Sequence, residues 1–484
     1  MNIQAQATPR EASSPSRWSM TLPQLWALVA VVLPMVVVVG YLSTVDLAYH
    51  IRAGDFMLSS QSLLRTDTFS FTSNGSSWLN QQWGAQIVLS LVFKGLGWAG
   101  LALVHAALVG TIFVFVYLAC RAKGAPARIS AWVSLAAFAA SLVNLSLRPQ
   151  LLGMALFALT LWLVVDRKGH PGRFLAIPVA VVVWANVHGS FFLGPLLVLL
   201  AWVEDRHEGR LATRTLLVGA ASVAATLVNP FGPRVWSYVS SLSRNSDITA
   251  HVTEWQAPSI RGPGGALFFL SVAAVATLLA RREGLVPWTT IIWLGAFFLI
   301  ALTAIRGTAW WAMAAAPAVV GLVGNRRSRR RDLPASALNT AIAFLLVIPG
   351  LALFPWSLVG TPADSPGKRV PGAPVGLTME IRRVAEPGDR IFNAQVWGSW
   401  FEFALPSNPV FVDSRIELFS HAIWKQYRAV SNGRQGWQAI LDRWRVRVVA
   451  ISPGQQEGLI PLIRRDRGWT LVYEDDYGLI FLRR

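Results

Sequence analysis

Residues 25–41 of the chain read LWALVAVVLPMVVVVGY, an apolar run that contains no charged side chain. Its length falls within the roughly 17–25 residues that a helix needs to cross the hydrocarbon core of a membrane. The run is too long for the apolar core of a typical signal peptide, and no clear cleavage site of small residues follows it. We therefore predict an uncleaved first membrane span.

Similar apolar runs recur along most of the chain. They lie near residues 25–43, 98–119, 129–145, 150–165, 174–189, 191–203, 214–229, 264–280, 287–305, 307–324 and 336–358. Of the 484 residues, 54% are hydrophobic and 14% are charged, whereas soluble proteins carry about a quarter charged residues. The sequence therefore predicts an α-helical polytopic membrane bundle of about 11 transmembrane helices.

The formal net charge of +18 would suggest nucleic-acid binding in a soluble protein, but the position of the charge excludes that class. The basic residues gather in short loops between the apolar runs: Arg121, Lys123, Arg128, Arg167, Lys168, Arg173, Arg206, Arg210, Arg214, Arg281, Arg282, Arg326, Arg327, Arg329, Arg330 and Arg331. With a cytoplasmic N-terminus, every cluster falls on the cytoplasmic side, as the positive-inside rule requires. We therefore predict a multi-pass protein of the inner or cytoplasmic membrane, in contact with membrane lipids and with no nucleic-acid partner.

This topology holds only if residues 78–95 do not cross the membrane. The segment begins with polar residues and ends at Lys94, so we interpret it as a helix on the outer surface. The resulting organisation is a cytoplasmic tail (1–24), a bundle (25–358) with a long first outer loop (44–97), a linker rich in proline and glycine (359–375) and an extracytoplasmic α/β domain (376–484). In that domain, Val410–Val412 reads as a strand and Asp475–Gly478 as a hairpin turn.

Polar and ionisable residues collect at the outer ends of the predicted spans and in the outer loops. They are Asp46, His50, Arg52, Asp67, Arg148, Asn186, His188, Glu254 and Arg306. Such groups are costly at membrane depth and usually face a cavity or one another, so we predict one polar cavity at the outer face. The alternatives are snorkelling of Arg148 and Arg306 to headgroups, hydrogen bonds between helices for Asn186 and His188, and a solvated loop charge or helix cap for Asp67.

The pattern Asp46-x-x-Tyr49-His50-x-Arg52 after a first span, followed by a long outer loop, resembles the GT-C superfamily. These integral-membrane glycosyltransferases use polyprenyl-phosphate-linked sugars; they include the catalytic subunit of oligosaccharyltransferase and the protein O-mannosyltransferases. In the family, an aspartate of this loop is the catalytic base or a metal ligand, and Asp46 matches it. The chain lacks an Asp-x-Asp pair in a later outer loop and a Trp-Trp-Asp motif in the C-terminal domain, so transfer of a single sugar fits better than oligosaccharide transfer to asparagine.

The implied reaction is sugar transfer from a polyprenyl-phosphate-linked donor to a glycan, lipid or protein acceptor in a bacterial cell envelope. Asp46, with His50 beside it, would act as general base. Arg52, Arg148 and Arg306 would stabilise the departing phosphate, because guanidinium pairs well with phosphate oxygens. Asp46 with Asp67 or Glu254 could also hold a divalent cation through oxygen ligands.

Two further residues follow the predicted strand at 410–412. Asp413 and Arg415 would lie past the carboxyl end of that strand, where α/β sheets usually bind ligands, and would help to bind the acceptor; the alternative is a salt-bridged turn. Two other functions remain open for the whole chain: a non-catalytic protein that binds a lipid-linked saccharide, and a transporter or flippase. A transporter would favour internal repeats and spans interrupted near the middle of the membrane, which are not clear here.

Overall fold

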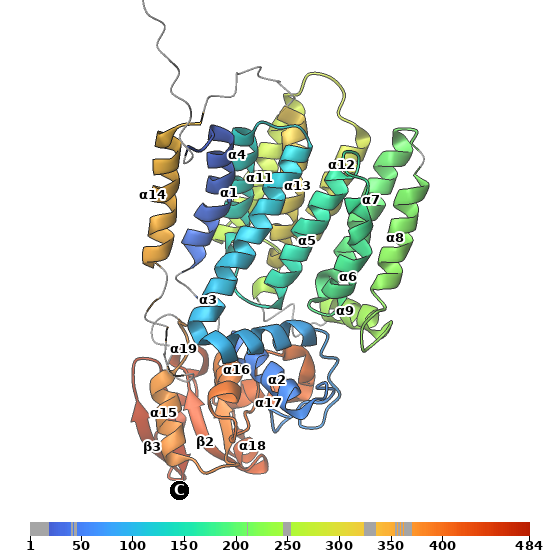
Figure 1. Ribbon diagram of the computed structural model, residues 1–484. Coiled ribbons are helices and arrows are strands. Elements are labelled where there is room, and N and C mark those ends of the chain that lie inside the picture. The colour runs from blue at the N-terminus through green and yellow to red at the C-terminus, as the bar shows by residue number, and fades with distance from the viewer. Residues whose placement is uncertain are drawn as a thin grey trace, which may run out of the picture.

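The computed structural model describes residues 19–39, 42, 46–210, 212–244, 253–323, 335–353, 356, 359, 362 and 370–484. The predicted basic cluster at 326–331, the segment 363–369 of the predicted linker and the tail before residue 19 lie outside the described residues. What is described forms a helical bundle with a smaller domain at one end (Figure 1).

The bundle consists of apolar helices that run roughly side by side (Figure 1). They are α1 (Leu22–Val38), α3 (Trp83–Ala122), α4 (Ala127–Ser141), α5 (Pro149–Asp166), α6 (Ile177–Ala185), α7 (Leu193–His207), α8 (Thr213–Ala225), α11 (Pro263–Ala280), α12 (Trp288–Thr303), α13 (Thr308–Val323) and α14 (Ala337–Leu353). Among the described residues, four helices are long and apolar enough to cross a membrane, namely α3, α4 with its 3-10 extension, α5 and α11. The count of about 11 spans therefore stays a prediction.

Helix α3 bends at Gly97, where the backbone adopts φ 58° and ψ −152°. This left-handed conformation is open to glycine at no steric cost, and it separates the helix into two arms. The first arm runs across the end of the bundle beside α2 (Asp46–Ser60), and the second arm enters the bundle (Figure 1). Helices α2 and α3 approach closely at Gly54, where a Cβ atom would come 2.1 Å from the carbonyl oxygen of Gln86.

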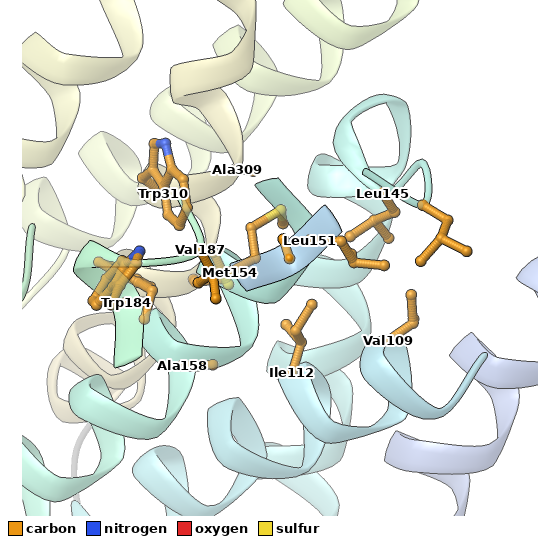
Figure 2. Close-up of a cluster of buried hydrophobic side chains, with 14 of the residues drawn as sticks. Val109, Ile112, Leu145, Leu151, Met154, Ala158, Trp184, Val187, Ala309 and Trp310 are labelled. Carbon is orange, nitrogen blue, oxygen red and sulfur yellow. The ribbon is translucent and has the colours of Figure 1, made fainter. Parts of the chain in front are cut away.

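The bundle core lies between α3, α5, α6 and α13. Figure 2 shows Ile112 of α3, Met154 of α5, Trp184 of α6 and Trp310 of α13 converging there, and all four side chains are buried. In contrast, α14 exposes most of its apolar side chains, which is the expected pattern for a helix that faces lipid.

The C-terminal domain contains a four-stranded sheet in the order β1-β2-β4-β3. Its strands are β1 (Arg390–Asn393), β2 (Val446–Ile451), β3 (Trp469–Glu474) and β4 (Leu479–Arg483). β1 pairs parallel with β2, and the remaining pairs are antiparallel. The predicted hairpin turn at Asp475–Gly478 is confirmed, because it joins the antiparallel pair β3 and β4. The helices are α15 (Val375–Val384), α16 (Gln395–Ala404), α17 (His421–Ser431), α18 (Trp437–Arg443), α19 (Pro453–Gln456) and α20 (Ile460–Ile463).

The predicted strand at 410–412 is wrong. Val410 makes only isolated bridges, one with Ser70 of the loop after α2 and one with Ile391 of β1. The segment is apolar because Val410, Phe411 and Val412 are buried, and burial alone does not require a strand ladder.

Aromatic side chains join the C-terminal domain to the bend of α3. The rings of Trp98 and Trp400 stack with their centroids 6.3 Å apart, and those of Phe93 and Phe403 meet edge to face at 5.5 Å. Short segments complete this end of the bundle: α9 (Arg234–Arg244) and the 3-10 turns η3 (Gly189–Phe192), η4 (Thr253–Trp255) and η5 (Ile305–Gly307). The site described next is built from them.

Candidate functional site

A cavity of about 950 Å³ lies where the bundle meets the C-terminal domain. Its lining combines α2, the turns η3, η4 and η5, helix α9 and the C-terminal domain. The predicted site residues that line it are Asp46, His50, Arg148, His188, Glu254, Arg306 and Arg415. Side chains more than 350 residues apart in the sequence therefore meet in one space.

Two arginines and two carboxylates form the charged centre of this cavity. Arg148 donates from Nη2 to Oε1 of Glu254 at 2.5 Å, and its Nη1 lies 3.4 Å from Oδ2 of Asp46. Arg306 donates from Nη2 to the other oxygen of Glu254 at 2.8 Å. Glu254 thus joins the two arginines, and Arg148 joins the two carboxylates.

Local backbone structure places each of these four side chains at the N-terminus of a helix or in a 3-10 turn. Asp46 begins α2, where a negative charge is favoured by the helix dipole. Arg148 is the extended N-cap of α5, and Pro149 occupies the first helical position. Glu254 and Arg306 stand in the 3-10 turns η4 and η5. All four are only partly exposed, with between 16% and 35% of the side chain accessible.

The pKa of Glu254 is lowered to about 2. Burial alone would raise the pKa of this carboxyl, but the positive charges of Arg148 and Arg306 outweigh that effect. Because the pKa in the folded protein is depressed, the contribution of these pairs to stability is present at neutral pH. It is lost progressively as the pH falls from the ordinary pKa of a glutamate through about 2. Glu254 therefore holds both arginines across the physiological pH range.

Two histidines line the described cavity. Burial lowers the pKa of His50 well below its ordinary value, and the charges of Arg148, His188 and Arg415 act in the same direction. At neutral pH the His50 imidazole can exchange hydrogen bonds but carries no positive charge. The Nδ1 atom of His188 lies 2.8 Å from the Ser190 hydroxyl.

Four predicted residues do not line the cavity. Arg52 pairs with Asp55 at 3.6 Å on the same helix. Asn186 accepts a hydrogen bond from Trp83 Nε1 at 3.0 Å and donates to the carbonyl oxygen of Val228. Its contacts match the alternative interpretation, hydrogen bonding between helices. Asp67 and Asp413 lie behind the cavity wall, in the network described next.

Arg415 is almost fully buried and is surrounded by three carboxyl groups. Its Nη2 lies 3.0 Å from Asp67, 3.0 Å from Glu402 and 2.5 Å from Asp413. The guanidinium also lies over the ring of Trp78, 4.7 Å from the centroid. Asp67 belongs to the loop after α2, whereas the other carboxyls belong to the C-terminal domain. Asp413 and Arg415 thus form part of a clamp between these two parts of the chain.

Several lining residues were not predicted from the sequence. Tyr49, Tyr238, Trp255 and Glu417 all line the cavity. Tyr49 precedes His50 and Glu417 follows Arg415 by two positions, so closeness in sequence to predicted residues could have identified both. Trp255 packs against Arg306, whose guanidinium carbon lies 4.4 Å from the ring centroid. Tyr238 gave no such signal, because it is one of several polar residues in an amphipathic segment.

The described residues that line the cavity do not fit a divalent cation. Asp46 and Glu254, one of the predicted ligand pairs, both contact Arg148, so a guanidinium lies where a shared cation would. Asp67, the other predicted partner, pairs with Arg415. Within the described parts of the chain, no group of three or more His, Cys, Asp or Glu residues is arranged to hold a metal ion.

No protein-family model matches this sequence, and no curated protein matches it either. Solved structures do. The oligosaccharyltransferase of Archaeoglobus fulgidus, tethered through a disulfide to an acceptor peptide with the NVT sequon, aligns with a TM-score of 0.53 and 12% identity, over 95% of this chain and 74% of that one. The apo form of the same enzyme gives a TM-score of 0.51 over the same shares, also at 12% identity. The chain has the oligosaccharyltransferase fold.

The expected resemblance holds at the level of the fold alone. Together with the apolar helices, this fold indicates a multi-pass membrane protein. At 12% identity the match carries no residue roles. The function of the cavity therefore depends on its own side chains.

Proposed function

We propose that the chain is a membrane glycosyltransferase that moves a sugar from a polyprenyl-phosphate-linked donor to an acceptor at the outer face of the membrane. The observation that carries this proposal is the meeting of Asp46, Arg148, Glu254 and Arg306 in one cavity of a GT-C fold. A second, smaller cavity of about 330 Å³ is bordered by three basic residues from loop ends, Lys123, Arg167 and Arg282. This second cavity lies at the opposite end of the bundle, which supports the orientation through the positive-inside rule.

Asp46 is the general base in this proposal. The acceptor hydroxyl oxygen attacks the anomeric carbon of the donor, and the bond between that carbon and the phosphate oxygen breaks. The hydroxyl proton passes to the Asp46 carboxylate, and the polyprenyl phosphate leaves with the bonding electrons. Asp46 is suited to this step because it lines the cavity with 28% of its side chain exposed, while Glu254 is occupied by two arginines.

Arg148 and Arg306 would receive the negative charge of the leaving phosphate. Both arginines line the cavity, and guanidinium groups pair well with phosphate oxygens. Apolar side chains from the membrane part, including Phe192, Ile300 and Trp310, also line the cavity. They provide the surface that the lipid end of a donor requires.

We expect Arg306→Ala to weaken donor use without unfolding the protein. Loss of one cation at the leaving phosphate should lower transfer by about 10²–10³-fold. The matched control is Arg281→Ala, which removes an exposed arginine after α11, away from the cavity. Initial rates in proteoliposomes at several donor concentrations measure the effect. Equal losses in both variants would contradict the role of Arg306.

Transfer should continue when divalent cations are removed. Because Arg148 already lies between Asp46 and Glu254, we expect the rate in excess EDTA to stay within about twofold of the untreated rate. The measurement is transfer by the purified protein before and after chelation, with Mg²⁺ and Mn²⁺ added back separately. A loss that is restored by one added metal would show that a cation displaces Arg148.

The direct test of the proposed function uses the purified chain in liposomes with a panel of radiolabelled polyprenyl-phosphate and polyprenyl-diphosphate sugars. Release of the sugar, to water or to an added acceptor, supports a transferase. Binding of a donor without release in any condition would instead identify a non-catalytic binding protein. Movement of intact donor between the two leaflets would identify a flippase.

A further inference from the structure

The cavity has a second wall, which belongs to the C-terminal domain and to which the mechanism above assigns no role. It carries Gln395, Glu417, Trp424, Arg428 and Gln455. In contrast to the arginine-rich wall of the bundle, this wall mixes amide, carboxyl, guanidinium and ring groups. It therefore offers hydrogen-bond donors and acceptors side by side.

One hydrogen bond joins this wall to helix α9 of the bundle. The hydroxyl of Tyr238, on α9, lies 3.0 Å from Oε1 of Glu417. Burial raises the pKa of Glu417, and it raises the pKa of Tyr238 well above its ordinary value. A carboxyl group in this setting retains acceptor sites beyond the one used by Tyr238, and when protonated it also donates. Glu417 and Tyr238 thus form a pair that suits ligands with hydroxyl groups.

The wall lies next to the helix turn that carries the proposed base. Tyr49 stands one turn after Asp46 on α2 and lines the same cavity. Burial raises the pKa of Tyr49, and the negative charges of both Glu417 and Asp46 add to this effect. Tyr49 therefore lies within electrostatic reach of both carboxyl groups. A small molecule against Glu417 would share this cavity with Asp46.

The chemistry of the wall disfavours two other occupants. A phosphate finds its partners on the arginine wall instead, where Arg148 and Arg306 lie. An extended peptide would pair with the edge of a sheet, but no residue of β1 to β4 lines the cavity in the described structure. Side chains from loops and helices form the wall, as in sites that bind compact polar molecules.

We propose that this wall is the acceptor subsite and that the acceptor is a saccharide, whose hydroxyl groups exchange hydrogen bonds with Glu417 and Tyr238. One hydroxyl of the saccharide then faces Asp46 and receives the transferred sugar. The rings of Trp424 and Tyr427, which also line the cavity, face the apolar side of the sugar. This inference rests on the proposed function for its reaction, but the binding itself does not depend on transfer.

The test combines binding with a half-reaction. A panel of methyl glycosides and short oligosaccharides is titrated against the full chain in detergent, with tryptophan fluorescence as readout. Glu417→Gln and Tyr238→Phe are compared with Glu457→Gln, which replaces an exposed glutamate outside the cavity. We expect the dissociation constant for a binding saccharide to rise about tenfold in the first two variants, because each loses one hydrogen bond to the ligand. It should not change in Glu457→Gln.

The half-reaction is donor hydrolysis without acceptor, measured with the radiolabelled polyprenyl-phosphate and polyprenyl-diphosphate sugars. Glu457→Gln should keep the hydrolysis rate of the unaltered chain, whereas Glu417→Gln should raise the KM for the saccharide acceptor more than it lowers kcat. Transfer to peptides with no saccharide binding would overturn the inference, as would an unchanged KM for the saccharide in Glu417→Gln. Saccharide binding that depends on Glu417, with neither hydrolysis nor transfer by the unaltered chain, would sustain the subsite and refute the transferase.

Discussion

Asp46→Asn is expected to abolish sugar transfer and leave a folded protein. Asparagine has nearly the same shape as aspartate but cannot take the acceptor proton, so the loss should be at least the roughly 10²–10⁴-fold that general-base catalysis contributes. Folding should survive, because Arg148 keeps its shorter contact to Glu254 when the 3.4 Å contact to Asp46 loses its charge. The measurement is the rate of transfer by the purified variant, alongside size-exclusion chromatography in detergent.

The matched control is Asp55→Asn. Asp55 lies on the same helix and pairs with Lys94 at 2.5 Å, but it does not line the cavity. The Asp55→Asn variant should keep its transfer rate within about twofold of the unaltered chain, since ion pairs with partly exposed partners contribute little to stability. Near-normal transfer in Asp46→Asn would refute the assignment of the base. Retained donor binding with no transfer would support it and would separate an enzyme from a binding protein.

Arg415→Leu should strongly destabilise the protein. The substitution leaves Asp67, Glu402 and Asp413 buried without their shared cation, and breaking a buried pair in this way typically costs about 3–5 kcal/mol. We expect a large fall in the unfolding temperature in detergent, or loss of folded protein during purification. Because the clamp joins the loop after α2 to the C-terminal domain, protease cleavage should begin at that junction.

Two further variants serve as comparisons for Arg415→Leu. Arg464→Leu breaks a pair with Glu474 in which both side chains are at least 39% exposed, so a change below about 1 kcal/mol is expected. Glu402→Gln should also be tolerated. Burial raises the pKa of Glu402 well above its ordinary value despite the opposing charge of Arg415, which favours the protonated form. A glutamine has nearly the same shape as that form. Equal destabilisation by all three variants would contradict the clamp.

The pH dependence of stability should follow from the same network. The ionised form of Asp413 is favoured, because Arg415 outweighs the burial that alone would raise its pKa. The stability that Asp413 contributes is thus lost at acidic pH, below its ordinary pKa. Glu402 has a raised pKa, so its contribution is lost as the pH rises instead.

Much of the site could be named from the sequence, but its geometry could not. Asp46 was marked by its position just after the first span and Glu254 by its position in an outer loop, and both line the cavity. Arg52 and Asp67 carried the same signal and have other partners. Ion-pair partners depend on which loops meet in space, and Arg148 and Glu254 are separated by 106 positions. No local pattern encodes such a pairing.

The sequence by itself determined the membrane bundle, the basic loop ends and the α/β composition of the C-terminal domain, because hydrophobic periodicity and charge are local properties. It also determined that polar residues gather at span ends. Only the tertiary structure decided that Arg148 lies between Asp46 and Glu254, and that Glu417 meets Tyr238 across 179 positions. Those contacts arise from the bend of α3 at Gly97 and from the packing of the C-terminal domain against it, which bring distant loops together around one cavity.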